Sequence, residues 1–201
     1  MKTMATKLGL ALCLMAMLLC SAACTASSDY MHEVHAPQAL RATPDSAVVV
    51  FIRPSGYARA MGSTILDGHG RFLGDSLPET YFAVRVPPGE HIFIAWAENT
   101  AALRASLAPG RTYYVEVAPK MGALSARMQL LAVTPRAESW GELRAWMGES
   151  KQTVPDEASG QAYLTSRRED VAERLHRAQE ILREYDAEEL AERTLTPGDG
   201  L

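Results

Sequence analysis

The sequence predicts a mainly β protein, an antiparallel β-sandwich of about seven or eight strands followed by a helical C-terminal extension with one long amphipathic helix. Short apolar or alternating runs recur between residues 46 and 134, and turn residues separate them about every eight to twelve positions. After Pro135, apolar residues recur at helical spacing instead. A chain of 201 residues is long enough for one domain with a core plus appendages.

Residues 46–134 carry the strand signals of the predicted sandwich. The β-branched and aromatic run Ala47–Ile52 ends at Arg53-Pro54 and predicts a buried strand. The turn Asp67-Gly68-His69-Gly70 predicts a hairpin, and Pro87-Pro88-Gly89-Glu90 is the strongest turn signal in the chain. The further strand candidates are residues 63–66, 71–74, 81–86, 91–96, 103–107, 112–117 and 126–133.

Four segments follow the predicted sandwich. We expect a short amphipathic helix within residues 135–150, a polar linker over 151–162, a long amphipathic helix over 163–192 and a tail over 193–201. One face of the long helix is apolar and must be buried against something, either this protein's own sandwich or a partner. As a possible partner-contact face it comprises Leu164, Val171, Leu175, Leu182 and Tyr185.

The N-terminus has the pattern of an export signal. Lys2 and Lys7 precede an apolar stretch from Leu8 to Leu19, and small residues then lead to Cys24. The apolar stretch is shorter than the roughly 20 residues that a membrane-spanning helix needs. We therefore expect a lipoprotein-type signal peptide over residues 1–23, lipid attachment at Cys24 and a flexible tether over residues 24–45.

Two alternatives to lipid attachment stay open. Ser21 and Ala23 also suit the peptidase that releases soluble proteins, and Ser21 stands where lipoproteins usually have Leu. A soluble secreted or periplasmic protein is the first alternative, and a retained helix is the second. Thr25 favours the outer membrane as destination if the organism has one.

The charge balance narrows the choice of partners. After loss of residues 1–23, which contain Lys2 and Lys7, 18 of the 20 basic residues face 24 acidic ones. With no basic patch, nucleic acid is not expected as a partner. Membrane attachment is expected to come from the N-terminus alone.

The order of the β-region motifs supports a resemblance. Phe51-Ile52-Arg53-Pro54, Leu66-Asp67-Gly68, Leu73-Gly74, Val86-Pro87-Pro88-Gly89-Glu90-His91 and Pro109-Gly110-Arg111-Thr112-Tyr113-Tyr114 follow one another. This order resembles the bacterial domain-of-unknown-function family 2846, found mostly in short exported lipoproteins, and is similar to PEGA-type surface β-sandwich modules. The likeness covers about Ser46 to Val133. It implies a small exported β-sandwich with no established enzyme activity.

Candidate chemical sites in the sequence are few. His32, Glu33 and His35, near Asp29, have one residue too few between the histidines for the zinc-protease spacing, and we interpret them as solvated linker. His91 and Asp67 are expected to bind the backbone of their own turns, and His69 lacks a partner. An aromatic platform for sugar rings is an alternative to core packing for Tyr57, Tyr81, Trp96, Tyr113 and Tyr114.

These observations predict a lipid-anchored cell-envelope protein with a non-catalytic binding or structural role. The sandwich would be the scaffold and the long helix the contact surface for another envelope protein or a second copy. The first alternative is a module that binds peptidoglycan or a surface glycan, and the second is an envelope enzyme of unknown class. We predict no catalytic residue, cofactor or metal, because no nucleophile motif, paired carboxylates or metal-ligand spacing is present.

Overall fold

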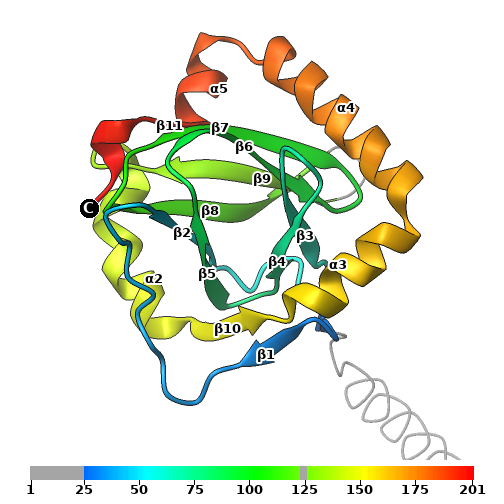
Figure 1. Cartoon of the computed structure of the whole chain (residues 1–201), viewed down its shortest axis with the longest axis horizontal. Coiled ribbons are helices and arrows are strands. Elements are labelled where there is room, and N and C mark those ends of the chain that lie inside the picture. The colour runs from blue at the N-terminus through cyan, green and yellow to red at the C-terminus, as the bar shows by residue number, and fades with distance from the viewer. Residues whose placement is uncertain (1–24, 123–125) are drawn as a thin grey trace, which may run out of the picture.

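The computed structural model describes residues 25–122 and 126–201, and Figure 1 shows them as two β-sheets bordered by helices. The predicted signal peptide and its lipid-attachment residue Cys24 lie outside the described residues. The two-sheet, mainly β architecture with C-terminal helices agrees with the predicted fold class at that level. Strands β2 to β9 fall within the predicted sandwich region, while β1, β10 and β11 lie outside it.

The two sheets contain eleven strands within the described residues. The order in the first, six-stranded sheet is β1 (Met31–Glu33), β10 (Lys151–Pro155), β5 (Thr80–Val86), β2 (Ala47–Arg53), β8 (Thr112–Met121) and β9 (Ala126–Val133). The order in the five-stranded sheet is β11 (Thr194–Leu195), β7 (Thr100–Leu107), β6 (Gly89–Trp96), β3 (Ser63–Asp67) and β4 (Phe72–Ser76). The hairpin predicted around residues 67–70 is the β3–β4 pair.

The main core lies between the inner faces of the two sheets. Side chains alternate between the faces of a strand, so Ala47, Val49 and Phe51 of β2 point inward while Val48 and Val50 point outward. The Phe51 ring stacks on Phe82 of β5 at 5.2 Å and meets Phe93 of β6 edge-on at 5.3 Å. The contact between Phe51 and Phe93 joins the two sheets, in the packing expected of a sandwich core.

The expectation of a purely antiparallel sandwich is corrected by three strand pairs. β2 runs parallel to β8, β5 parallel to β10, and β7 parallel to β11. A parallel pair needs a long crossover connection, and each of these pairs has one. Between β2 and β8 the chain passes through five other strands, and helices precede both β10 and β11. The sheets are therefore mixed.

The expectation of one long helix over residues 163–192 is also corrected. The segment contains α3 (Glu157–Ser166), α4 (Arg168–Glu184) and α5 (Ala187–Glu192), which follow the shorter η1 (Glu138–Glu142) and α2 (Leu143–Glu149). The helical path breaks at Arg167, where φ is −118° and ψ is 31°, and again at Tyr185, where ψ is 133°. Asp186 then caps α5 by accepting from the backbone N–H groups of Glu188 and Glu189.

The expected tether and the expected linker pair with each other in the structure. β1 lies within residues 24–45, β10 lies within residues 151–162, and the two strands pair antiparallel. The Gln152 side-chain amide binds the backbone of Gln38 twice, at 2.8 and 2.9 Å. Because the buried residues of β10, Gln152 and Thr153, are polar, the strand has no hydrophobic pattern to reveal it.

The expected tail connects the two sheets. Thr194 and Leu195 form β11 beside β7, and the short η2 (Pro197–Asp199) follows. Leu201 then exchanges two backbone hydrogen bonds with Thr112 at the start of β8, both 2.9 Å long. We call residues 194–201 the C-terminal clasp, because they bind one strand of each sheet.

Candidate functional site

The predicted partner-contact face is covered by the protein's own sheet. Leu164, Val171 and Leu182 are buried, and the partly exposed Leu175 and Tyr185 pack against the same core. In Figure 1, α4 runs along the outside of β6 and β7. Of the two alternatives left open by the sequence, the structure shows intramolecular packing.

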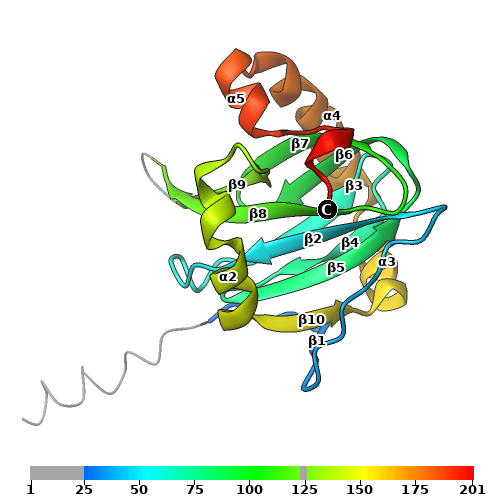
Figure 2. The same ribbon diagram turned by 90° about the vertical axis from the view of Figure 1, so that its left-hand side faces the viewer.

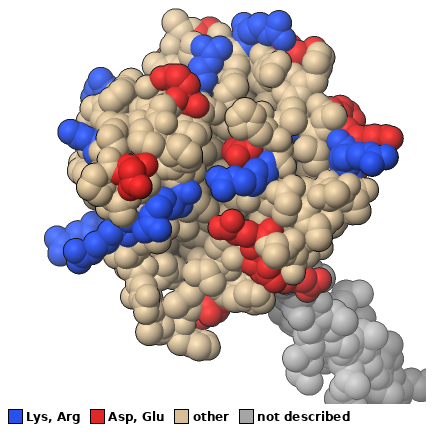
Figure 3. All heavy atoms as spheres, viewed as in Figure 1, with Lys and Arg blue, Asp and Glu red and all other residues tan. Residues whose placement is uncertain are grey.

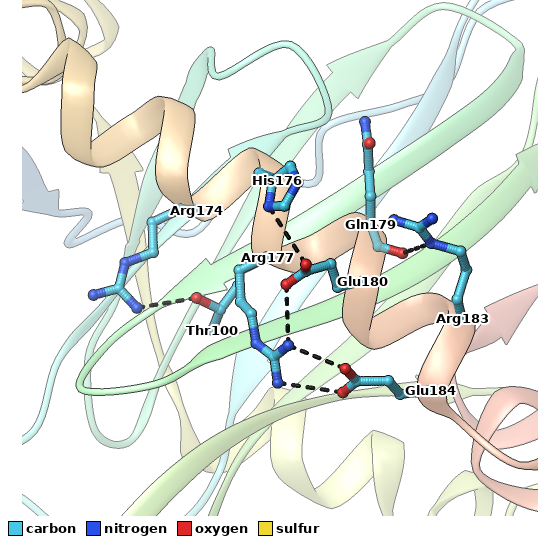
Figure 4. A network of polar contacts seen from close by, with 8 residues as sticks. All are labelled: Thr100, Arg174, His176, Arg177, Gln179, Glu180, Arg183 and Glu184. Carbon is cyan, nitrogen blue, oxygen red and sulfur yellow. Dashed lines mark hydrogen bonds and ion pairs between the residues drawn. The ribbon is translucent and has the colours of Figure 1, made fainter.

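The polar side of α4 forms a charged network, shown in Figure 4. Arg177 contacts Glu180 at 3.1 Å and Glu184 at 3.1 and 3.2 Å, all on the exposed helix surface. Arg174 instead reaches the sheet, where it donates to the Thr100 hydroxyl at 3.0 Å and lies over the Trp96 ring. Arg177 is therefore paired within the helix, whereas Arg174 connects the helix to the sheet.

Two turn residues behave as the sequence predicts. Asp67 accepts hydrogen bonds of 2.9 Å from the backbone N–H groups of His69 and Arg71. His91 Nε2 lies 2.8 Å from the carbonyl oxygen of Pro87 in the preceding turn. Both side chains stabilise their turns, which accounts for their positions without any chemical role.

The candidate metal residues lie on and after the edge strand β1. Glu33 pairs with Lys151 of β10 at 3.0 Å, and the side chains of His32 and His35 are exposed. Over residues 25–122 and 126–201, no group of three His, Cys, Asp or Glu side chains has a metal-binding arrangement.

The five aromatic candidates do not share one surface. Tyr113 is fully buried, and its hydroxyl accepts from the Ala108 N–H at 2.8 Å. Tyr81 and Tyr114 line a hollow of about 530 Å³ on the outer face of the six-stranded sheet, beneath residues 37–42. Trp96 lies under Arg167 and Arg174 of the helical region, and Tyr57 is exposed on a loop. A sugar platform made of all five is therefore not formed.

A larger pocket of about 930 Å³ lies on the outer face of β8 and β9. Residues of η1 and α2 border it, together with residues between 191 and 196, just before and at the start of the C-terminal clasp. Figure 2 shows α2 beside β8. Its volume is in the range of small-molecule sites. The pocket is lined by Glu116, Leu131, Ala132, Thr134, Arg136, Ala137, Glu138, Ser139, Glu142, Trp146, Ala191, Glu192, Thr194 and Thr196. We call it the Glu116 pocket.

Glu116 is the chemically distinctive residue of this pocket. On β8, Tyr113, Val115 and Val117 point into the core, so Glu116 points to the outer face. Burial, with a further contribution from the negative charge of Glu142, raises the pKa of the Glu116 carboxyl to about 7. No side chain among the described residues donates a hydrogen bond to this carboxylate. Its negative charge is therefore poorly compensated inside the pocket.

The rest of the pocket is acidic, with one aromatic side chain. Glu138, Glu142 and Glu192 add carboxylates, whereas Arg136 is its single cation and pairs with buried Asp199 at 2.7 Å. Trp146 of α2 offers an indole ring, and hydroxyl groups come from Ser139, Thr134, Thr194 and Thr196. The arrangement suits a ligand with positive charge and an apolar body.

Sequence reasoning missed this pocket because its residues come from separate elements. The motif Tyr-Tyr-Val-Glu-Val reads as a strand, and its one carboxylate reads as an ordinary solvated position. The available signal is that Glu116 stands among apolar residues, in a strand that has a neighbour on each side in its sheet. The contribution of Glu142 depends on how α2 lies over the sheet, which no local pattern gives.

The face shown in Figure 3 mixes basic and acidic side chains without a large area of one sign. Within the described residues, no helix has both the length and the apolar character needed to cross a membrane. No family model, curated protein or solved structure matches the chain.

Proposed function

We propose that this chain is an exported, lipid-anchored cell-envelope protein with a non-catalytic binding role, and that the Glu116 pocket is its ligand site. The anchor rests on the signal pattern that ends at Cys24. The binding role rests on one observation, the uncompensated Glu116 carboxylate in a pocket of ligand size. The likeness to the domain-of-unknown-function family 2846 belongs to this proposal, because exported lipoproteins are typical of that family.

The ligand class follows from the charges of the pocket. A cation placed between Glu116 and Glu142 offsets their repulsion, and the Trp146 ring attracts the same charge through its π face. Hydroxyl groups around the rim supply hydrogen bonds. An organic ammonium compound, such as a small amine or a quaternary ammonium ion, has the positive charge and the apolar body that this pocket can bind.

Calorimetric titration of the processed protein with putrescine and with benzyltrimethylammonium tests this ligand class. Glu116 must be ionised to bind a cation, so affinity should fall about tenfold between pH 8 and pH 6. Glu116→Gln should weaken binding and abolish this pH dependence. Glu98→Gln, an exposed change outside the pocket, is the matched control and should leave binding unchanged. Absence of binding at pH 8 would reject the organic cation.

A glycan ligand is the second candidate, favoured by the Trp146 ring beside carboxylate and hydroxyl groups. Sugar rings stack on aromatic side chains, and polar groups of this kind bind their hydroxyls. Sedimentation with purified sacculi separates the two candidates. A glycan ligand predicts pelleting that Trp146→Ala abolishes, whereas the cation predicts no pelleting.

Mass spectrometry of the N-terminal peptide tests the anchor. A diacylglyceryl group on Cys24 is expected, and Cys24→Ala should move the protein from the membrane fraction to the soluble fraction. Release of an unmodified chain would support the secreted alternative. The ligand site and the anchor are thus tested independently.

A further inference from the structure

We propose that the folded domain rests directly on the bilayer through one edge of the molecule, made by Tyr57, Lys120, Met121 and Arg127. We call these four residues the membrane edge. The inference rests on the proposed lipid anchor at Cys24 and adds to it a defined orientation on a lipid surface containing anionic headgroups. It replaces the picture of a domain standing off the membrane on a tether.

The proposed lipid-attachment residue Cys24 is only a short length of chain away from the folded domain. Ala26 already donates a backbone hydrogen bond of 2.6 Å to the carbonyl oxygen of Arg59. Ser28 donates to Asp75 of β4 at 2.5 Å, and the Tyr30 ring stacks on Tyr163 of α3 at 5.3 Å. Only two residue steps separate Cys24 from Ala26, and they span at most about 7 Å. A lipid on Cys24 therefore holds this part of the fold at the headgroups.

The loop over residues 54–62, which contains Arg59, is fixed to the sandwich. The fully buried Arg53 guanidinium at the end of β2 donates to the carbonyl oxygens of Tyr57 and Ala58, both at 2.9 Å, and to that of Met61. The loop over residues 54–62 is therefore anchored from within. It presents Tyr57 beside the segment that leads to Cys24.

An exposed contact between Tyr57 and Met121 joins this loop to β8. The Tyr57 hydroxyl donates to the Met121 sulfur at 3.3 Å. Tyr57 is 43% exposed and Met121 is 72% exposed, so both rank among the few large apolar residues on the surface. Tyrosine favours the interface between membrane and water, because its ring is apolar and its hydroxyl is polar.

Two basic side chains of this edge lie close together without a counter-charge. Lys120 and Arg127 stand directly opposite each other on β8 and β9, and both are exposed. Like charges in this position repel and destabilise the strand pair. Neither has an ion-pair partner within residues 25–122 and 126–201. Anionic lipid headgroups would supply the missing counter-charge.

The acidic side chains near this edge do not neutralise Lys120 and Arg127. Glu79 is occupied by Arg59 at 2.8 Å. Glu98 lines a hollow with Ala58 and Met61. Its neighbour Asn99 binds the backbone of Met128 next to Arg127, yet Glu98 forms no ion pair with Arg127. Figure 2 shows the start of the described chain, the β2–β3 loop, the last residues of β8 and the first residues of β9 on the same, left-hand side. A bilayer on that side meets all of them.

The test compares fluorescent labels at two exposed apolar positions. Met121→Cys carries an environment-sensitive nitrobenzoxadiazole label at the edge, and Leu201→Cys carries it at the other end of β8, where Leu201 is bound to Thr112. Nine residue steps along β8 separate these ends by about 30 Å. Both variants are made in the full chain, extracted after processing and placed in vesicles of phosphatidylcholine with about one-third phosphatidylglycerol.

We expect a blue shift and at least a twofold rise in emission at Met121→Cys, and no change at Leu201→Cys. Lys120→Glu together with Arg127→Glu should halve the rise, since the anionic surface then repels the edge. Mass spectrometry of Cys24 on the same samples reports the anchor separately. A lipidated chain with equal spectra at both positions would overturn the membrane edge and leave the anchor standing. An unlipidated chain that shows no rise would remove both.

Discussion

The outer faces of the two sheets are covered in different ways. On the five-stranded sheet, Ala178 and Leu182 of α4, with Tyr185 just after it, pack closely against small residues such as Ala102 of β7. A hollow of about 430 Å³ lies elsewhere on β6 and β7, beside Ile92 and Arg104. On the six-stranded sheet, the seven-residue α2 covers the middle of the face and leaves a hollow on either side. Small residues opposite a long apolar stripe allow a helix to pack closely on a sheet, whereas a short helix over mixed residues leaves room for a ligand beside it.

The largest effect should come from opening the close contact between α4 and the five-stranded sheet. Leu182→Ala removes a side chain that is 3% exposed, and the cavity should lower the free energy of unfolding by about 3 kcal/mol. Leu131→Ala, in the half-buried lining of the Glu116 pocket, should cost about 1 kcal/mol. Urea denaturation of both variants measures the difference. Equal losses would mean that the two outer faces are equally well packed.

Replacing one glycine by alanine in α3 and one in α2 compares how closely the helices on the two sheets are packed. In α3, a Cβ at Gly160 would lie 2.3 Å from the Phe72 ring, so Gly160→Ala should cost about 2 kcal/mol. In α2, a Cβ at Gly148 would meet nothing within 4 Å, and Gly148→Ala should stabilise by about 0.5 kcal/mol through helix propensity. Thermal unfolding should show shifts of opposite sign. Shifts of the same sign would contradict the close approach of α3.

The two outer faces should also differ in how pH affects stability, because only the six-stranded sheet has the Glu116 carboxyl on its outer face. Its pKa of about 7 in the folded chain is above the ordinary value of 4.5, so the folded chain binds this proton more tightly. Stability should therefore fall as pH rises from about 4.5 to about 7, and Glu116→Gln should remove that fall. Allowing for partial exposure, the variant should be more stable than the parent above pH 7 by on the order of 1 kcal/mol. Unfolding at pH 4, 6 and 8 measures this, and a gain independent of pH would contradict it.

The smallest effect is expected on the exposed side of α4. Arg177→Ala breaks the contacts with Glu180 and Glu184, but these side chains are solvated and screened by salt. No measurable change in the urea midpoint is expected. Arg174→Ala loses the bond to Thr100 and the contact with Trp96, and should shift the midpoint more. A larger shift for Arg177→Ala would mean that the surface network orders the helix.

The strands of the sandwich could be predicted because their side chains follow a pattern with a local cause. Ala47–Ile52 is apolar on both faces, and β2 is buried on both faces because the five-stranded sheet covers its inner face, while α2 and residues 37–42 lie over its outer face. The turn roles of Asp67 and His91 were predictable for the same reason, since donor and acceptor lie within a few residues.

The remaining elements depend on contacts between distant residues. β1 and β10 are recognisable only as a pair, because each is short and Gln152 and Thr153 are buried through hydrogen bonds rather than apolar area. The helical segment breaks at Arg167, which lies over the ring of Trp96, a residue far away in the sequence. The Glu116 pocket needs β8, η1, α2 and residues 191–196 together. No window of sequence contains that arrangement.

The C-terminal clasp has a consequence for the order of folding. Thr112 at the start of β8 and the outer edge of β7 both pair with residues that are synthesised much later than they are. Until residues 194–201 exist, β7 presents unpaired backbone groups, and edges of that kind associate with other chains. A chain shortened before Thr194 should therefore aggregate during synthesis. A fusion partner is therefore better inserted in a surface loop than joined at Leu201, whose backbone is hydrogen-bonded to β8 of the six-stranded sheet.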